Sequence, residues 1–344
     1  MRARWGAARG VGLRHNRPMS LGEFELIARH FTRPVQRALL GVGDDCALLA
    51  PTPGMQLAVS SDLLVEGRHF LSTVPPASLG HKALAVNLSD LAACGASPLA
   101  FMLMLAMPQA DDIFLGDFSS GLFALADAQG IELIGGDTTA GPLTVGITVL
   151  GEVPPNAALR RSGARAGDDL WVSHPREGGI GDARLALEVF RGKVQLEGEA
   201  FSQLRRAMEW PQPRVALGVA LRGVAHSAID LSDGLAGDLG HLLAQSRVGA
   251  LLEWTALPRS GVLSGLPLPL QQQCVLGGGD DYELLFSAPA SARPAVQRAA
   301  AQADVAVSRI GEIQPGSGLR VRWPDGGTSP WAPRGFDHFA SDAR

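Results

Sequence analysis

Three aspartates, Asp230, Asp233 and Asp238, interrupt the otherwise apolar segment IDLSDGLAGDLGHLL (229–243). A buried carboxylate without a partner normally takes up a proton, because its charged form is costly away from water. It stays ionised when a cation lies beside it. The segment therefore points to a cation site, which needs further ligands from elsewhere in the chain.

Six short segments share one design, in which a strand or turn ends and glycine, serine or aspartate continues the chain. They are GVGDDCALL (41–49), SSDLLVEGRHF (60–70), NLSDLAACGA (87–96), IGGDTTAGP (134–142), IDLSDG (229–234) and GGGDDYELL (277–285). Glycine lets the backbone approach a ligand closely. Aspartate with serine or threonine hydroxyls supplies hard oxygen ligands, which suit Mg²⁺ better than zinc or copper. The segments together predict a magnesium site.

Each segment taken singly also fits a turn or a helix N-cap, where aspartate and serine are favoured. Asp90 fits this alternative least, because it lies in the middle of the expected helix HKALAVNLSDLAACG, between Leu88 and Leu91. Six such segments favour cation binding over six unrelated turns.

Several catalytic motifs are absent from the sequence. It has no P-loop GxxxxGK[ST], no HRD or DFG, no GxSxG and no HExxH, and DLSDG is not the DxD of aspartyl-phosphate enzymes. The remaining interpretation is phosphate transfer in which Mg²⁺ neutralises most of the charge. The protein then contributes position and electric field rather than a nucleophile.

The composition limits the class of protein. With 344 residues, 46% of them hydrophobic and 19% charged, the chain is typical of a globular protein of two domains. A net charge of −4 gives no electrostatic basis for binding nucleic acid, and no long uncharged apolar run predicts a membrane span. The cysteines Cys46, Cys94 and Cys274 are far apart and odd in number, which fits a reducing cytoplasm.

Residues 1–18 differ from the rest, with five arginines, no acidic residue and no apolar core of a secretory signal. We expect a disordered extension, or a misassigned start with Met19 as the first residue. A functional basic tail is the alternative interpretation.

Short β-rich runs alternate with helical runs, which predicts the α/β (α+β) class. The polar, Pro- and Gly-rich stretch 153–168 marks the expected boundary between domains 19–154 and 155–344. Strands are expected at 56–62, 101–107, 131–136, 143–153, 170–173, 226–231, 249–254, 282–288 and 305–313. Helices are expected at 79–95, 112–129 (stopped by Gly130), 181–191, 213–223 and 233–245.

In their order, the motifs resemble one family closely, bacterial thiamine-monophosphate kinase of the aminoimidazole-ribonucleotide synthetase superfamily. The resemblance covers residues 22–339 and is carried by GEFELIARHF, GDDCALL, KALAVNLSDLAACGA, LIGGDTT, RSGARAGD, AIDLSDGL, DYEL and GFDHF. It implies ATP-dependent phosphorylation of thiamine monophosphate to thiamine diphosphate, by direct in-line transfer of the γ-phosphoryl group with several Mg²⁺ ions. It also implies a homodimer in which the N-terminal ATP- and metal-binding domains pair into a β-barrel. The C-terminal domain, a mixed sheet with helices, completes the site.

The resemblance also implies roles for individual residues. No covalent catalytic residue is implied, and Asp90 and Asp230 are the most critical for transfer. The implied metal ligands are Asp45, Ser60, Ser61, Asp62, Asp90, Asp137, Asp230 and Asp233. The implied ATP contacts are Gly136, Asp137, Arg161 and Ser232. The implied contacts with thiamine monophosphate are His69, Asp280 and Phe336.

Some of these residues also have plainer interpretations. His69 fits a polar surface residue, Arg161 a solvated linker residue, and Phe336 hydrophobic cover for the C-terminal segment. Asp280 stands where a glutamate is more usual in the family, and Phe336 where a tyrosine is frequent. The charged loop 174–182 replaces a stretch of small residues, which leaves its role open.

Three other functions remain as alternatives. Another ATP-using synthetase of the superfamily is one, although selenophosphate synthetase would need Cys and Lys near the N-terminus. No Cys precedes Cys46 and no Lys precedes Lys82. The others are a nucleotide- or thiamine-phosphate-binding protein without turnover, and a Mg²⁺-dependent phosphohydrolase.

Overall fold

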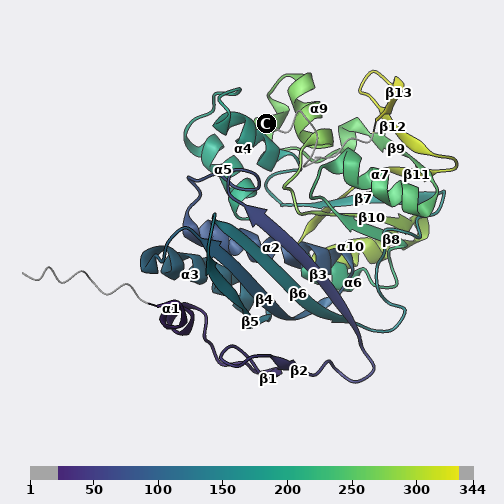
Figure 1. Cartoon of the computed structure of the whole chain (residues 1–344). Helices are drawn as coiled ribbons and strands as arrows, with labels where there is room; N and C mark the ends of the chain where they lie inside the picture. The colour runs from purple at the N-terminus through teal and green to yellow at the C-terminus, as the bar shows by residue number, and fades with distance from the viewer. Residues whose placement is uncertain (1–21, 333–344) are drawn as a thin grey trace, which may run out of the picture.

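The computed structural model describes residues 22–332, so the predictions for residues 1–18 and for Phe336 lie outside the described part. Two β-sheets with helices packed on them form the structure, which confirms the α/β class (Figure 1). A two-stranded ribbon of β1 (Ala38–Leu40) and β2 (Leu48–Leu49) lies apart from both sheets. Within residues 22–332, neither sheet closes into a barrel.

The N-terminal sheet has four strands in the order β3-β6-β4-β5. Its strands are β3 (Gln56–Val65), β4 (Ser97–Met107), β5 (Glu132–Ala140) and β6 (Thr144–Val153). Neighbouring strands are antiparallel except β4 and β5, which are parallel and are joined by the helix α3 (Asp112–Gln129). A parallel pair needs such a crossover. The four strands predicted from the sequence here are confirmed, with shifted ends.

Helices α2 (Pro76–Ala93) and α3 cover one face of this sheet (Figure 1). The helix α3 begins after Asp111, whose carboxylate accepts hydrogen bonds from two backbone N–H groups of its first turn, and it ends at Gly130 with φ 63°. The predicted end at Gly130 is therefore confirmed. A Cβ on Gly121 would lie 1.9 Å from the Ala77 carbonyl oxygen, so glycine permits the close approach of the two helices.

The helix α2 is apolar on nearly all sides, which is typical of a helix buried between layers. It contacts α3 and strand β3 on the N-terminal side, and α6 (Val215–Ala220) and β8 (Ser227–Asp230) on the C-terminal side. One hydrophobic core runs from the four-stranded sheet through α2 to Trp171 and Phe286 of the C-terminal half. The helix thus places residues of both halves beside one another.

The C-terminal sheet has seven strands in the order β13-β12-β9-β11-β7-β10-β8, and only β12 and β9 are a parallel pair. The remaining strands are β7 (Asp168–His174), β9 (Gly249–Glu253), β10 (Leu284–Pro289), β11 (Ala306–Gln314), β12 (Gly318–Arg322) and β13 (Thr328–Trp331). The other helices are α1 (Glu23–His30), α4 (Asp182–Phe190), α5 (Gly198–Glu209), α7 (Leu235–Ser246), α8 (Gly261–Ser264), α9 (Leu268–Gly277) and α10 (Arg293–Gln302).

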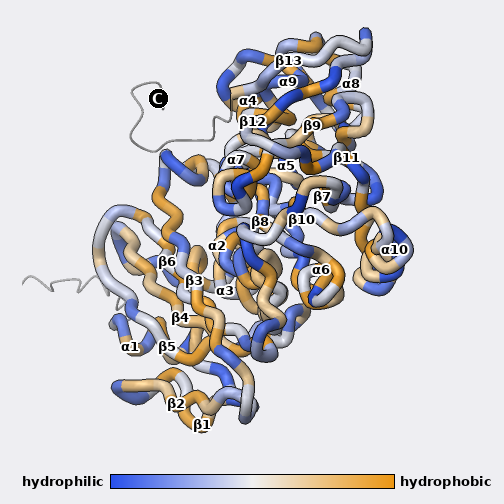
Figure 2. Tube along the Cα trace, turned by 90° about the vertical axis from the view of Figure 1, so that its right-hand side faces the viewer, coloured by the Kyte–Doolittle hydropathy of each residue, from blue (hydrophilic) through white to orange (hydrophobic). Residues whose placement is uncertain are grey.

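The predictions missed several peripheral elements, including α5, α10 and the β12–β13 hairpin. Both α5 and α10 bury only three residues each, so they lie at the periphery of the fold. A second hydrophobic core lies within the C-terminal half. Figure 2 shows apolar residues along the strands of the four-stranded sheet.

No helix among residues 22–332 has the length and apolar character needed to cross a membrane.

Candidate functional site

Three elements bring polar side chains together where α2 meets β3 and β8. The Ser60 hydroxyl on β3 donates to a carboxylate oxygen of Asp90 on α2 at 2.5 Å. One residue earlier on α2, the Ser89 hydroxyl donates to Asp230 at the end of β8 at 2.9 Å. These contacts join residues 30 and 141 positions apart in the sequence. Asp62 belongs to the same group, since its backbone N–H donates to the Asn87 side chain of α2 at 2.9 Å.

Asp62, Asp90 and Asp230 are called the acid cluster below. Burial raises the pKa of Asp62 to about 6, and the charges of Asp90 and Asp233 add to the effect. Burial and the charge of Asp90 raise the pKa of Asp230 to about 8. Burial also raises the pKa of Asp90, against the Ser60 hydrogen bond and the positive charge of Arg161. The carboxylates thus repel one another, and Asp230 is buried while Asp62 is exposed to solvent, which favours a bound cation that enters from the Asp62 side.

A cavity of about 290 Å³ opens onto the acid cluster. Among its lining residues are Ser60, Asp90, Cys94, Arg160, Arg161 and Asp230. Carboxylates and two arginines therefore share one cavity. A carboxylate can hold a metal ion and arginine binds phosphate oxygens, so the cavity suits a metal–phosphate ligand.

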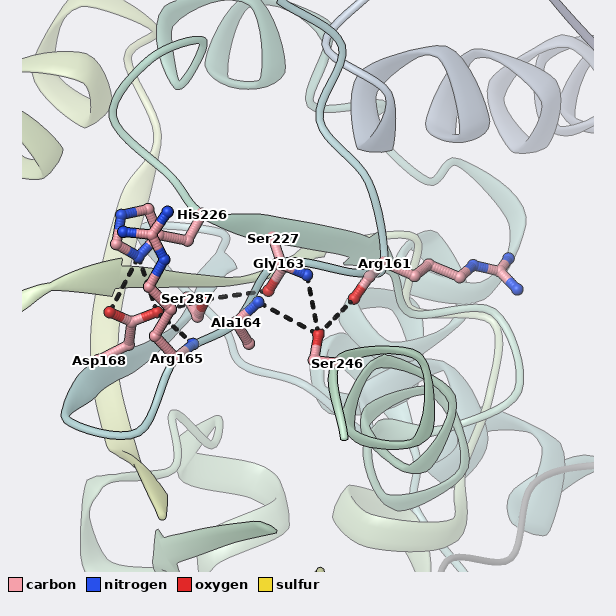
Figure 3. Close-up of polar contacts among 9 residues, drawn as sticks. All are labelled: Arg161, Gly163, Ala164, Arg165, Asp168, His226, Ser227, Ser246 and Ser287. Atoms are coloured by element: carbon pink, nitrogen blue, oxygen red, sulfur yellow. Dashed lines mark hydrogen bonds and ion pairs between the residues drawn. The ribbon is translucent and has the colours of Figure 1, made fainter. Parts of the chain in front are cut away.

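The backbone around Arg161 is held against the C-terminal end of α7 (Figure 3). The Ser246 hydroxyl donates to the Arg161 carbonyl oxygen at 3.0 Å and accepts from the backbone N–H groups of Gly163 and Ala164, both at 3.1 Å. The Arg161 side chain extends away from these contacts. The backbone of Arg161 is therefore fixed, while its side chain is exposed and lines the cavity beside the acid cluster.

The same segment is anchored at Asp168 (Figure 3). Its carboxylate accepts hydrogen bonds from the His226 ring at 2.9 Å, from the Ser287 hydroxyl at 3.1 Å and from the Arg165 backbone N–H at 2.9 Å. Asp168 therefore joins the start of β7 to β8 and β10, beside the residues that hold Arg161.

The three aspartates of the segment 229–243 have different surroundings. Asp230 belongs to the acid cluster. The Asp238 carboxylate accepts from the backbone N–H groups of Asp233 and Gly234, both at 3.1 Å, at the start of α7. Asp238 thus stabilises the turn that leads into the helix, and burial raises its pKa to about 7. Asp233 lies close enough to Asp62 for its charge to raise the Asp62 pKa.

Asp280 forms an ion pair that the sequence-based reasoning missed. The Lys82 ammonium group lies 3.2 Å from an Asp280 carboxylate oxygen, and the Lys82 side chain is only 3% exposed. The Tyr282 hydroxyl donates to the other oxygen at 3.1 Å. Asp280 and Tyr282 have φ of 69° and 51°, a costly conformation for residues other than glycine. One signal was available in the sequence, because Lys82 is one of only two lysines.

Ser232 lies beside Asp280, whose backbone N–H donates to the Ser232 carbonyl oxygen at 2.9 Å. His69 lies in the turn after β3, where its Nδ1 accepts from the backbone N–H of Val65, the last residue of the strand, at 3.0 Å. His69 and Asp280, the expected contacts with thiamine monophosphate, thus both have partners within the chain.

Three of the expected metal ligands lie neither in the acid cluster nor in contact with it. Asp45 is exposed in the loop between β1 and β2. Ser61 is on the side of β3 opposite Ser60 and contacts the Thr148 hydroxyl at 2.7 Å. Asp137 is exposed on β5. The structure therefore does not bring these side chains to Asp90.

Gly136 precedes Asp137 on β5 and has φ of 149°. A Cβ at this position would lie 1.7 Å from the Leu103 carbonyl oxygen on the neighbouring strand. Any other residue would therefore push β4 and β5 apart. The fold thus requires glycine here, in addition to the expected contact of Gly136 with ATP.

In residues 22–332, no three side chains of His, Cys, Asp or Glu are arranged so that they could hold a metal ion together. This finding bears on which cation the acid cluster can take. Zinc sites are built from three or four protein ligands, whereas Mg²⁺ is commonly bound through one or two carboxylates and the phosphates of a substrate. The acid cluster therefore fits Mg²⁺ that arrives with a phosphate ligand.

The chain matches two family descriptions in sequence. "AIR synthase related protein, N-terminal domain" matches residues 43–153, and "AIR synthase related protein, C-terminal domain" matches residues 165–324. Solved structures of the hydrogenase maturation protein HypE share the fold at 20% identity, with a TM-score of 0.74 for one of them. The fold and the site thus define an AIR synthase related protein.

Closer relatives specify the family. A thiamine-monophosphate kinase of Escherichia coli O157:H7 is 43% identical over 331 residues, which cover 94% of this chain and all of the relative. The crystal structure of thiamine-monophosphate kinase from Stenotrophomonas maltophilia K279a is 44% identical, with a TM-score of 0.79 over 88% of this chain and 95% of that one. A structure described as AaThiL complexed with AMPPCP and TMP is 27% identical, with a TM-score of 0.72 over 84% and 89%. The chain belongs to the thiamine-monophosphate kinase family, as its motifs predicted.

Proposed function

We propose that this chain transfers the γ-phosphoryl group of ATP to thiamine monophosphate and releases ADP and thiamine diphosphate. The observation that carries the proposal is the meeting of Asp62, Asp90 and Asp230 beside Arg161, in a chain of the thiamine-monophosphate kinase family. The relative AaThiL has been solved with both AMPPCP and TMP. An ATP analogue and the acceptor thus occupy one protein of this fold together.

Mg²⁺ is the cation that we assign to the acid cluster. Each ion would be held by one or two of the carboxylates of Asp62, Asp90, Asp230 and Asp233 together with phosphate oxygens, with Ser60 as a supporting hydroxyl. The fit rests on the hard oxygen donors and on carboxyl groups whose pKa burial raises. When bound, Mg²⁺ would neutralise charge on the phosphate oxygens.

The residues of the chain then have separate tasks. The Arg161 guanidinium group binds nucleotide phosphate oxygens, and Ser232 contacts the same nucleotide. Asp280 and His69 position thiamine monophosphate. A phosphate oxygen of the acceptor forms the new bond to the γ-phosphorus as the bond to the β-phosphate oxygen breaks, so no protein atom becomes phosphorylated.

The experiment that tests the function follows thiamine species by chromatography after the protein is mixed with ATP, Mg²⁺ and thiamine monophosphate. We expect thiamine diphosphate with an equal amount of ADP, and no reaction in EDTA. ADP without thiamine diphosphate would instead identify a hydrolase or another acceptor. Tight binding of nucleotide or thiamine monophosphate without any product would identify a binding protein.

We expect pH to control how strongly Mg²⁺ with AMPPCP stabilises the protein. Asp230 has a pKa of about 8 in the folded chain, against an ordinary value of 3.8. Between these pH values the folded chain without ligand therefore binds one proton more than the unfolded chain. Its stability falls as pH rises through this range. Mg²⁺ needs the ionised carboxylate. The thermal shift that Mg²⁺ with AMPPCP causes should therefore grow between about pH 7 and about pH 9.

Differential scanning fluorimetry at several pH values measures this shift, and Asp230→Asn is the matched variant. The variant should show a smaller shift that no longer depends on pH in this range. An equal thermal shift at about pH 7 and at about pH 9 in the unmodified protein would show that metal binding does not depend on ionisation of Asp230.

We also propose a homodimer in which the four-stranded sheets of two copies face each other. Helices cover one face of the sheet, whereas large apolar side chains are exposed on the other. These exposed side chains are Leu57, Val59 and Leu63 of β3 and Met102 and Met104 of β4. Strand pairing through β6 places them on one continuous surface. An exposed apolar patch of this kind is typical of a protein–protein interface, and a second sheet would cover it as half of the expected barrel.

Replacing Val59 and Leu63 together by aspartate should separate the two copies, because the paired sheets would then bury charges. Sedimentation equilibrium should give about twice 36.0 kDa for the unmodified protein and 36.0 kDa for the variant. Ile113→Asp, at an 80% exposed position on α3, is the control and should leave the mass unchanged. A monomeric unmodified protein would contradict the proposed dimer.

Two further assignments remain proposals. The domain limits 19–154 and 155–344 are supported by the two separate sheets, of residues 56–153 and 168–331. A cytoplasmic location is supported by Cys46, Cys94 and Cys274, all of which are free thiols in the structure.

A further inference from the structure

The segment 159–164 contributes both arginines of the cavity beside the acid cluster, and hydrogen bonds hold it to the neighbouring elements. The Leu159 backbone N–H donates at 3.0 Å to the carbonyl oxygen of Cys94, the residue after α2. The Arg160 carbonyl oxygen accepts at 2.9 Å from the backbone N–H of Ala228 on β8. The start of the segment is thus held in register with the helix and the strand that carry two residues of the acid cluster.

The rest of the segment is held by one side chain, that of Ser246 (Figure 3). Its hydroxyl donates to the Arg161 carbonyl oxygen and accepts from the backbone N–H groups of Gly163 and Ala164. A serine hydroxyl has one hydrogen to donate and two lone pairs to accept, so these three bonds use its full capacity. The two bonds at the start of the segment join backbone atoms. Ser246 is therefore a contact of this segment that a substitution can remove.

His226 encloses Gly163 from another side. A Cβ at Gly163 would lie 2.4 Å from the His226 carbonyl oxygen, so the two backbones are in close contact. The His226 ring is itself hydrogen-bonded to the Asp168 carboxylate at 2.9 Å. The segment thus passes between a fixed residue just before β8 and the Ser246 hydroxyl at the end of α7.

The helix α7 connects Ser246 with the region of the acid cluster. At its start, the Asp238 carboxylate holds the turn 232–234, which follows the acid-cluster residue of β8. At its end, Arg247 has φ of 57° and its backbone N–H bonds back to carbonyl oxygens of the last turn. Ser246 is therefore the last residue of a helix that is closed at both ends. Because a helix is a rigid element, α7 sets the distance between the turn 232–234 and the segment 159–164.

We propose that Ser246 is a positioning residue of the nucleotide site, which holds the Arg161 backbone so that the guanidinium group lies at the cavity beside the acid cluster. The inference rests on the proposed kinase function, in which Arg161 binds nucleotide phosphate oxygens. An exposed arginine loses rotamer freedom when it binds a phosphate, and ordering a mobile backbone at the same time would add to that loss. Ser246 orders this backbone before the nucleotide binds, which strengthens binding without a contact of its own.

The first test measures the binding of AMPPCP with Mg²⁺ by isothermal titration calorimetry. Ser246→Ala should raise Kd about three- to tenfold, which is the usual effect of ordering a long side chain and its loop on binding. Ser246→Thr keeps the hydroxyl and should bind as the unmodified protein does. Ser202→Ala is the matched control, because this exposed serine of α5 bonds only within its own helix and does not line the cavity. An unchanged Kd in Ser246→Ala would overturn the inference.

Steady-state kinetics separates positioning of the nucleotide from a general structural effect. Ser246→Ala should raise KM for ATP by the same factor as Kd, while kcat and KM for thiamine monophosphate stay within about twofold. Loss of a contact made equally in the ground state and the transition state changes KM alone. A rise of both KM values together would contradict the inference.

A double-mutant cycle tests whether Ser246 acts through Arg161. Arg161→Met should weaken binding of AMPPCP about tenfold or more, since a hydrogen bond to a charged group contributes that much. Adding Ser246→Ala to Arg161→Met should then change Kd less than about twofold, because the side chain that Ser246 positions is already lost. The same effect of Ser246→Ala in both backgrounds would overturn the inference.

Hydrogen exchange followed by mass spectrometry shows whether Ser246→Ala loosens the segment alone. The amides of the segment 161–164 should exchange at least about tenfold faster, while those of β7 and α7 keep their rates. Faster exchange throughout β7 and α7 would give Ser246 a role in stability only, which would overturn the inference.

The calorimetry needs no turnover, so it also separates this inference from the kinase proposal. If AMPPCP binding depends on Ser246 but no thiamine diphosphate forms, the inference stands and the kinase proposal fails. If thiamine diphosphate forms and Ser246→Ala binds AMPPCP as tightly as the unmodified protein, the kinase proposal stands and the inference is overturned. Absence of AMPPCP binding to the unmodified protein would contradict both.

Discussion

Asp90→Asn should lower kcat at least about 100-fold while the protein keeps its fold, because removing a preorganised electrostatic contact to a transition state typically costs this much. Asparagine has the volume of aspartate and can still accept the 2.5 Å hydrogen bond from Ser60. Only the negative charge at the centre of the acid cluster is lost. Steady-state assays of thiamine diphosphate formation, with circular dichroism to check the fold, measure both parts of the prediction.

Asp230→Asn should behave in the same way, since the negative charge of Asp90 acts on Asp230 and both belong to the acid cluster. Asp117→Asn is the matched control, because this aspartate is exposed on α3 and is none of the expected site residues. It should retain normal kcat. Near-normal turnover in Asp90→Asn would remove the acid cluster from the mechanism.

Arg214→Met should lower the free energy of unfolding by about 3–5 kcal/mol, the usual effect of leaving a buried charge without its partner. The Arg214 guanidinium group forms two hydrogen bonds with the Glu283 carboxylate, one of them at 2.7 Å. The substitution strands Glu283, which is 4% exposed, between β7 and β10. The change should also disturb the neighbouring residues Asp280 and Asp281. Urea denaturation followed by circular dichroism measures the loss.

Arg322→Met provides the comparison for an exposed ion pair. Arg322 lies 2.6 Å from Glu253, with exposures of 47% and 29%, so its loss should cost less than about 1 kcal/mol. The double variant Arg214→Met with Glu283→Leu should recover part of the stability, because no charge then remains buried. Equal stability of Arg214→Met and the unmodified protein would show that Glu283 is solvated or protonated.

Local signals in the sequence predicted most elements near the site. Asp111 and Gly130 bracket α3 because a side-chain cap and a left-handed glycine are properties of a few adjacent residues. Asp90 was recognised as unusual because it lies in the middle of an apolar helix. The order of the motifs was sufficient to indicate the family, since a linear pattern needs no knowledge of contacts.

Contacts between distant segments could not be predicted in this way. The family resemblance implied that Ser60, Ser61 and Asp62 are consecutive metal ligands. A strand, however, alternates its side chains between two faces. Ser60 therefore reaches Asp90, and Ser61 contacts Thr148 on the opposite face of the sheet. Which face is buried depends on the helix that packs there, and the run itself does not contain that information.

The amino-acid sequence by itself determined the α/β class, the acidic motifs and the family of this protein, because these depend on residue types and their order. Only the tertiary structure decided which acids meet, that Lys82 pairs with Asp280, and that Ser246 holds the backbone of Arg161. The physical reason is that α2 is buried between the two halves of the chain. Its packing sets distances between residues that are far apart in sequence, and no local pattern encodes those distances.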